Sequence, residues 1–151
     1  PGGSTENRWW PADRFAQLAD YLSQKYNARI FLLGASRDAG PISQVLAGVC
    51  KETKIINLLN QSFDEFKATV DRLHLVIGND SGPMVTADAF DVANIVLVGP
   101  TDPREYHRPP GPLNRVVAAE DRIMASISLQ NVIKEADSVL GVLQKQKILI
   151  R

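Results

Sequence analysis

The stretch Gly78-Asn79-Asp80-Ser81-Gly82-Pro83 decides the fold of this 151-residue chain, because it directly follows the largely apolar run Leu73–Ile77. A second apolar run, Ile95–Val98, ends in Gly99-Pro100-Thr101-Asp102-Pro103. In an open α/β sheet the ligand crevice lies at the carboxyl ends of the strands. The first turn also opens a predicted helix, whose free N–H groups attract anions. The two turns together predict a phosphate or sugar site.

Outward from these turns, apolar runs alternate with amphipathic segments. The pattern predicts strands at residues 28–33, 54–59, 74–78, 94–99 and 115–118. Helices are predicted at 12–26, from Pro41, after a capping box of Ser62 and Glu65, at 82–90, and after Ser128. Continuous apolar strands between helices are typical of a parallel sheet covered on both faces. We therefore predict one α/β domain, a Rossmann-like doubly wound parallel sheet in three αβα layers.

This domain is expected to span residues 11–146. Residues 1–10 are expected to form a linker or loop that contacts phosphate, and 147–151 a tail. The turn after the first predicted strand, Gly34-Ala35-Ser36-Arg37-Asp38, departs from G-x-G-x-x-G. That departure disfavours a nicotinamide-dependent dehydrogenase.

The composition is that of a soluble globular protein, with 44% hydrophobic and 23% charged residues. The 17 basic residues balance the 17 acidic ones, so nucleic acid is not an expected partner. No apolar run approaches the ~20 residues that span a bilayer, and no signal peptide is recognisable. Because the first residue is not Met, we expect a piece of a longer protein. The single cysteine, Cys50, allows no internal disulfide and is expected to be buried on a helix.

The turn at 78–84 offers several groups to a ligand. Gly82 allows close approach, and Pro83 sets the first helical turn. We expect the N–H groups of Ser81, Gly82 and Met84 to face a diphosphate, and Asp80 to accept hydrogen bonds from sugar hydroxyls. The alternative is a plain helix N-cap, where such residues are common.

Other candidate residues lie near the same edge. Thr101 and Asp102 would line the crevice or simply form a tight turn. Ser4, Thr5 and Arg8 precede the first helix, where hydroxyls and a guanidinium could clamp phosphate oxygens, or the segment could be a solvated linker.

Three further residues complete the set. Asp38 could hold a ribose hydroxyl or be a surface turn residue. Trp9 and Trp10 are expected to be packing anchors.

The ordered blocks Arg8–Phe15, Leu32–Gly34, Gly78–Met84 and Gly99–Pro103 resemble the C-terminal half of bacterial heptosyltransferases, glycosyltransferase family 9 with the GT-B fold. The resemblance covers about residues 1–140. It implies transfer of heptose from an ADP-activated donor to lipopolysaccharide core, with inversion and without an essential metal or other cofactor. It also implies that Ser4, Thr5 and Arg8 contact phosphate and that Asp38 meets the ribose.

For the remaining residues, the resemblance implies that Asp80 holds sugar hydroxyls, that Ser81, Gly82 and the helix start hold the diphosphate, and that Thr101 and Asp102 line the crevice. The family's acceptor-binding half, which supplies the catalytic base and takes a lipid-linked saccharide, would precede Pro1. This chain alone would then bind the nucleotide sugar and catalyse nothing. The implied location is the cytoplasm, with the full-length protein peripheral at the inner face of the inner membrane.

The chain also departs from the family pattern. Val85 stands where histidine often follows Met, Arg8 replaces a lysine, Asp38 replaces a glutamate, and residues 88–94 interrupt a small-residue helix. Two alternatives stay open: a degenerate, non-catalytic nucleotide-binding or interaction module, and half of another GT-B enzyme such as a nucleotide-sugar epimerase.

Overall fold

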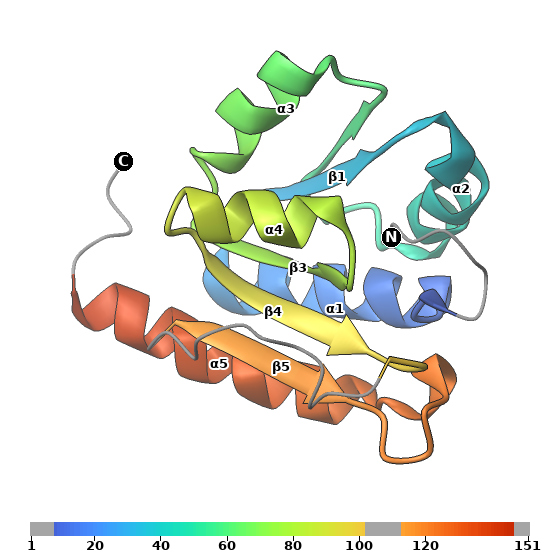
Figure 1. Cartoon of the computed structure of the whole chain (residues 1–151). Helices are drawn as coiled ribbons and strands as arrows, with labels where there is room; N and C mark the ends of the chain where they lie inside the picture. Colours follow the sequence, from blue (N-terminus) through green and yellow to red (C-terminus); the bar gives the residue numbers. More distant parts are fainter. Residues whose placement is uncertain (1–7, 102–112, 147–151) are drawn as a thin grey trace.

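The computed structural model describes residues 8–101 and 113–146, and in this part of the chain helices and parallel strands alternate as the sequence predicts (Figure 1). The strands are β1 (Ile30–Gly34), β2 (Ile55–Leu59), β3 (Leu75–Asn79), β4 (Ala93–Val98) and β5 (Asn114–Ala118). The helices are α1 (Ala12–Tyr26), α2 (Ala39–Gly48), α3 (Phe63–Val70), α4 (Gly82–Ala89) and α5 (Leu129–Lys145). The Rossmann-like α/β prediction is thereby confirmed.

Local sequence signals account for the starts of α3 and α5. The capping box of α3 is formed, because the Glu65 N–H donates to Ser62 Oγ at 3.3 Å and the Ser62 N–H donates to Glu65 Oε2 at 2.8 Å. At the start of α5, Ser128 Oγ accepts from the Asn131 N–H at 3.2 Å. The predicted start of α2 is two residues late, because α2 begins at Ala39 and carries Pro41 in its first turn. Proline is tolerated there, since first-turn N–H groups have no intrahelical acceptor.

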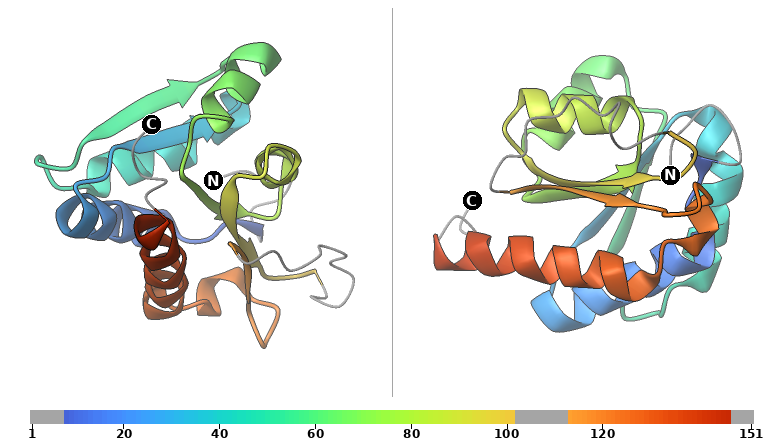
Figure 2. Two further views of the ribbon diagram at one scale, coloured as in Figure 1. Left: turned by 90° about the vertical axis from the view of Figure 1, so that its left-hand side faces the viewer. Right: turned by 60° about the horizontal axis from the view of Figure 1, so that its bottom comes forward.

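Strand β4 divides the core into two layers of packing. Its Ile95 and Leu97 belong to the cluster formed with α1, α2 and α5, whereas Val96 and Val98 belong to the cluster formed with α3 and α4. Alternate side chains of a strand point to opposite faces, so both faces of this strand are buried. Figure 2 shows α4 and α5 on opposite sides of β4 and β5. This is the predicted three-layer arrangement.

The parallel strands fall into two hydrogen-bonded sections rather than one continuous sheet. Among the described residues, β1 pairs with β2, and β4 pairs with both β3 and β5. An apolar cleft of about 780 Å³ lies between β1 and β3, over side chains of α1 and α5. Local patterns predict strands but not which edges meet.

Cys50 does not lie on a buried helix face, and that prediction is wrong. Helix α2 ends at Gly48, and the next residue is extended, with φ −80° and ψ 151° at Val49. Cys50 is exposed after this break, and its N–H donates to Asp20 Oδ1 at 3.0 Å.

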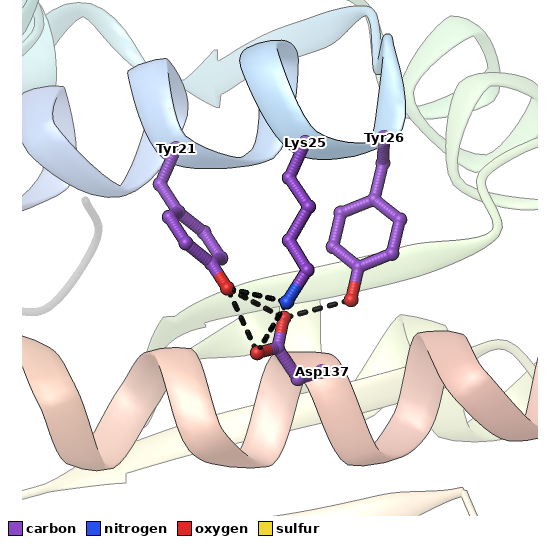
Figure 3. Close-up of polar contacts among 4 residues, drawn as sticks. All are labelled: Tyr21, Lys25, Tyr26 and Asp137. Atoms are coloured by element: carbon purple, nitrogen blue, oxygen red, sulfur yellow. Dashed lines mark hydrogen bonds and ion pairs between the residues drawn. The ribbon is translucent and has the colours of Figure 1, made fainter.

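A polar cluster joins α1 to α5 (Figure 3). Asp137 accepts from the Tyr21 hydroxyl at 2.8 Å, from the Tyr26 hydroxyl at 2.7 Å and from Lys25 Nζ at 2.9 Å. Lys25 Nζ also donates to the Tyr21 hydroxyl at 2.7 Å. We call these four residues the α1–α5 clasp.

Among the described residues, no helix is both long and apolar enough to span a membrane.

Candidate functional site

The turn between β3 and α4 lies at the carboxyl edge of the strands, where the sequence places the site. β3 and β4 run parallel with Asn79 beside Leu97, so the turns that follow both strands emerge side by side. The Asp80 N–H donates to the Leu97 carbonyl at 3.1 Å, which fixes the start of the turn against β4. In Figure 1 the arrowheads of β3, β4 and β5 point to the side where α1 begins.

Helix α4 begins without a side-chain cap. Ser81 occupies the N-cap position in an extended conformation, but its hydroxyl donates back to the Asn79 carbonyl at 3.1 Å. The plain N-cap alternative therefore does not describe this turn. A Cβ on Gly82 would meet no atom within 4 Å, so the space before it is open. First-turn N–H groups in such a position are available to an anion.

Met84 has a different place from the one predicted. Its N–H donates to the Ser81 carbonyl at 3.0 Å, so it does not face a ligand. Its side chain is 1% exposed and packs against Gly78, where a Cβ would lie 3.4 Å from the sulfur. Within the turn, Ser81 and Gly82 therefore carry the available N–H groups, and Pro83 contributes helix geometry and no donor.

The turn after β4 packs closely against a later segment of the chain, at Met124. A Cβ on Gly99 would lie 2.9 Å from the Met124 backbone nitrogen, so only glycine fits without a shift. Pro100 and Thr101 follow, both partly exposed, at the same edge as Asp80. Asp102 lies outside the described residues.

The segment before α1 is tied to the same edge by a long-range bond. The Trp10 N–H donates to Asn79 Oδ1 at 3.0 Å, and Asn79 is fully buried. The Trp10 indole N–H donates to the Ile127 carbonyl at 2.9 Å, so its packing role is confirmed. Arg8 stands two residues earlier, no more than about 7 Å of extended chain away. Ser4 and Thr5 lie outside the described residues.

Asp38 lies at the end of β1 but turns inward. Its carboxylate is 3% exposed, and Oδ2 accepts from the Ala35 N–H at 2.8 Å. Its Cβ and Oδ2 lie over Gly34, where an added Cβ would come within 2.9 Å and 3.2 Å of them. Asp38 is therefore not the exposed turn residue that was one alternative. Its carboxylate closes the β1–α2 turn.

Two polar residues at the carboxyl ends of β1 and β2, Ser36 and Asn60, are not among the predicted site residues. Ser36 is exposed, and its hydroxyl donates to Asn60 Oδ1 at 2.8 Å. The Asn60 N–H donates to the Gly34 carbonyl at 2.9 Å, and Asn60 has φ 62°. An asparagine directly after an apolar strand is the signal that could have marked this turn, since asparagine tolerates the left-handed conformation.

Asn79 is the third residue whose role the local pattern hides. It is part of the quoted motif, but its partner Trp10 is 69 positions away. Around the site, and elsewhere in the described residues, no group of three or more His, Cys, Asp or Glu side chains could hold a metal ion.

Comparison with known proteins shows the family to which this chain belongs. The model of glycosyltransferase family 9 (heptosyltransferase) matches residues 1–136. The chain belongs to glycosyltransferase family 9. Lipopolysaccharide heptosyltransferase 3 of Escherichia coli (strain K12) is 32% identical over 94 residues, which are 62% of this chain and 27% of that protein.

Solved structures agree with this family 9 fold. E. coli ADP-heptose LPS heptosyltransferase II is 24% identical, with a TM-score of 0.84 over 97% of this chain and 46% of its own. E. coli heptosyltransferase WaaC with ADP-2-deoxy-2-fluoro heptose is 20% identical, with a TM-score of 0.75 over 90% of this chain and 40% of its own. The chain thus spans less than half the length of these relatives.

Proposed function

We propose that this family 9 chain is the donor-binding part of an inverting heptosyltransferase-like enzyme, and that its donor is an ADP-sugar, with ADP-heptose as the first candidate. The observation that carries the proposal is the uncapped start of α4 at the edge where β3 and β4 end. The similar heptosyltransferase that holds an ADP-heptose analogue supports the choice of nucleotide.

Each of the site residues would contact a different part of the donor. The N–H groups of Ser81 and Gly82, at the positive end of α4, would take diphosphate oxygens. Arg8 would add a guanidinium, whose planar fork suits phosphate. Asp80 would accept hydrogen bonds from the sugar hydroxyls, and Thr101 would border the same space. Ser4, Thr5 and Asp102 keep their predicted donor contacts as part of the proposal.

The nucleoside would lie toward the ends of β1 and β2. The Asp38 carboxylate is buried and accepts a hydrogen bond from the Ala35 N–H. The polar groups that this edge presents to a ribose are therefore those of Ser36 and Asn60. This replaces the ribose role first expected of Asp38.

The departing ADP carries the negative charge that develops during transfer. Preorganised N–H dipoles and a cation stabilise such charge in a transition state, and here Arg8 and the α4 start would do so. We therefore propose that donor binding needs no metal. Affinity for ADP should be the same in EDTA and in Mg²⁺, and a requirement for Mg²⁺ would contradict this part.

The catalytic base and the main acceptor site would belong to the rest of a longer protein. Since the chain spans 46% of heptosyltransferase II, we propose that the rest supplies the catalytic base and the main acceptor site for a lipid-linked saccharide. The isolated chain would then bind the donor without transferring sugar. We propose a cytoplasmic location for the full enzyme, with peripheral contact at the inner membrane.

Calorimetry of the chain with ADP and ADP-heptose tests the proposal. Binding of both ligands is expected, with ADP-heptose tighter because Asp80 adds sugar contacts. CDP serves as the nucleotide control and should bind more weakly. The proposal is lost if the folded chain, verified by circular dichroism, binds neither ADP nor ADP-heptose at millimolar concentration.

A further inference from the structure

A second hollow opens between the N-terminal ends of α1 and α2. It is a cavity of about 500 Å³, and its lining includes Trp9, Arg37 and Gln44. None of the donor-turn residues Asp80–Met84 lines it. It adjoins the donor turn all the same, because Trp10, which also lines it, bonds to Asn79 at the end of β3.

The polar groups at this cavity are available to a ligand. Arg37 and Gln44 are exposed, and within residues 8–101 and 113–146 neither side chain forms a hydrogen bond or ion pair. An Arg guanidinium offers a planar fork of donors that matches a carboxylate or phosphate. A Gln amide offers both a donor and an acceptor, which is the pairing that a sugar hydroxyl needs.

The charge around the cavity favours an anion. Arg37 is the charged side chain among its described lining residues. Helix α1 begins here without a side-chain cap, so its positive end adds to the field. Two aspartates, Asp13 and Asp38, are close in sequence to the lining residues, but neither lines the cavity. Asp13 is exposed elsewhere on the surface, and the Asp38 carboxylate points inward and accepts from the Ala35 N–H.

The apolar part of the lining suits a sugar ring. Trp9 presents an indole that is only partly buried, beside Pro11 and Pro41. Aromatic rings supply large, rigid contact surfaces, and the C–H face of a pyranose packs on them while its hydroxyls stay hydrated. Sequence reasoning treats Trp9 as a packing anchor, but its place in this cavity gives it a surface that a ligand can reach.

We propose that this cavity is a second saccharide subsite, which takes a sugar unit carrying a carboxylate or a phosphate. The inference rests on the proposed function, because a glycosyltransferase has to hold an acceptor sugar beside its donor. Trp9 would contact the ring, Arg37 the oxyanion and Gln44 a hydroxyl. Part of the acceptor would then be recognised by this chain rather than by the remainder of the enzyme alone.

NMR of the ¹⁵N-labelled chain can test this directly, since the sequence holds two tryptophans. The Trp10 indole N–H is bonded to Ile127 and serves as an internal reference, while the Trp9 indole reports on the cavity. The probes are methyl glucuronide, glucose 6-phosphate and neutral methyl glucoside, each titrated to millimolar concentration with and without saturating ADP.

The expected result is a shift of the Trp9 indole with at least one anionic probe, at five-fold or more lower concentration than with methyl glucoside. Which anionic probe is stronger distinguishes a carboxylate from a phosphate ligand. Arg37→Gln should abolish the preference for the anion. Arg29→Gln, which removes an exposed arginine at the opposite end of β1, should leave it intact.

Three results would overturn the subsite: no Trp9 shift with any probe, equal affinity for neutral and anionic probes, or competition with ADP, which would assign the cavity to the donor. The Ser81 and Gly82 amides, followed in the same spectra, report ADP binding separately. If they respond to ADP while Trp9 responds to no sugar, the subsite fails and the donor site stands.

Discussion

The β1–α2 turn and the β3–α4 turn occupy equivalent places in the fold but use their polar groups in opposite ways. Both follow a parallel strand, and both open a helix at the carboxyl edge. In the first turn, Asp38 is buried and bonds to the Ala35 N–H. In the second, Ser81 leaves the α4 start uncapped, and Gly82 faces open space.

The difference shows how one topology separates support from binding. A turn that satisfies its own N–H groups is stable but offers few of them to a ligand. A turn that leaves them open gives up that stabilisation and gains an anion site. We therefore expect changes in the β1–α2 turn to lower stability, and changes in the β3–α4 turn to lower donor affinity.

Replacing the two aspartates gives the largest contrast. Asp38→Ala should lower the free energy of unfolding by ~1–3 kcal/mol, because it removes a buried carboxylate and the acceptor of the Ala35 N–H. Asp80→Ala should lower it by less than Asp38→Ala does, because the Asp80 side chain is only partly buried. Urea unfolding of both variants measures this, and equal losses of stability would contradict the division between the turns.

The glycines of the two turns provide a matched pair of substitutions. Gly34→Ala should cost ~1–3 kcal/mol of stability, because the new Cβ would lie 2.9 Å from both the Asp38 Cβ and the Ile42 Cδ1. Gly82→Ala meets no atom within 4 Å, so stability should be unchanged or slightly higher. ADP affinity should nevertheless fall about five-fold, or ~1 kcal/mol, in Gly82→Ala. Thermal unfolding and calorimetry separate the two effects, and unchanged ADP affinity in Gly82→Ala would count against the open turn as the phosphate site.

Asp80→Asn tests whether this turn contacts the sugar or the nucleotide of the donor. The amide keeps the size of the carboxylate but loses the charge that strengthens bonds from sugar hydroxyls. Affinity for ADP-heptose should fall about ten-fold, or ~1.4 kcal/mol, while affinity for ADP stays within two-fold. Parallel calorimetric titrations give the ratio. A similar loss for both ligands would move Asp80 from the sugar to the nucleotide.

The smallest expected effect lies in the α1–α5 clasp, far from both turns. Burial raises the pKa of Asp137, but hydrogen bonds from Lys25, Tyr26 and Tyr21 outweigh it and leave the pKa below its usual value. Because folding lowers this pKa, the contribution to stability is present above about pH 3.9 and is lost as the pH falls through the folded value.

Asp137→Asn should therefore destabilise the protein at pH 7 by under ~1 kcal/mol, as expected for a partly exposed ion pair. The difference from the unmodified chain should shrink below pH 4. Urea unfolding at pH 7 and pH 3 gives the comparison, with Tyr21→Phe as a variant that loses one donor and should show a smaller difference. A penalty that is equal at both pH values would exclude a charge-dependent clasp.

The sequence predicts the elements well because their signals are local. The Ser62 and Glu65 capping box, the Ser128 cap and the apolar run along residues 95–98 all act over a few residues, and each appears in the structure. The candidate turn after β3 is placed correctly for the same reason. A strand that ends in small polar residues can be read without knowing its neighbours.

What the sequence leaves open depends on contacts between distant segments or on side-chain direction. The bond from Trp10 to Asn79 joins positions 69 apart, and no local pattern encodes it. The inward turn of Asp38 and the internal bond of the Met84 N–H are choices among allowed local geometries. The gap between β1 and β3 likewise depends on how strand edges meet in space.

The measurement that tests the central claim most directly is an amide-shift titration of the ¹⁵N-labelled chain with ADP-heptose. The account predicts that the Ser81 and Gly82 amides shift strongly, because they receive the diphosphate. The Ala35 amide, already bonded to Asp38, should shift less than the Ser81 and Gly82 amides, because only the ribose is expected near it. Large shifts of the Ala35 amide, with no shift of the Ser81 and Gly82 amides, would contradict the account and place the donor at the β1–α2 turn.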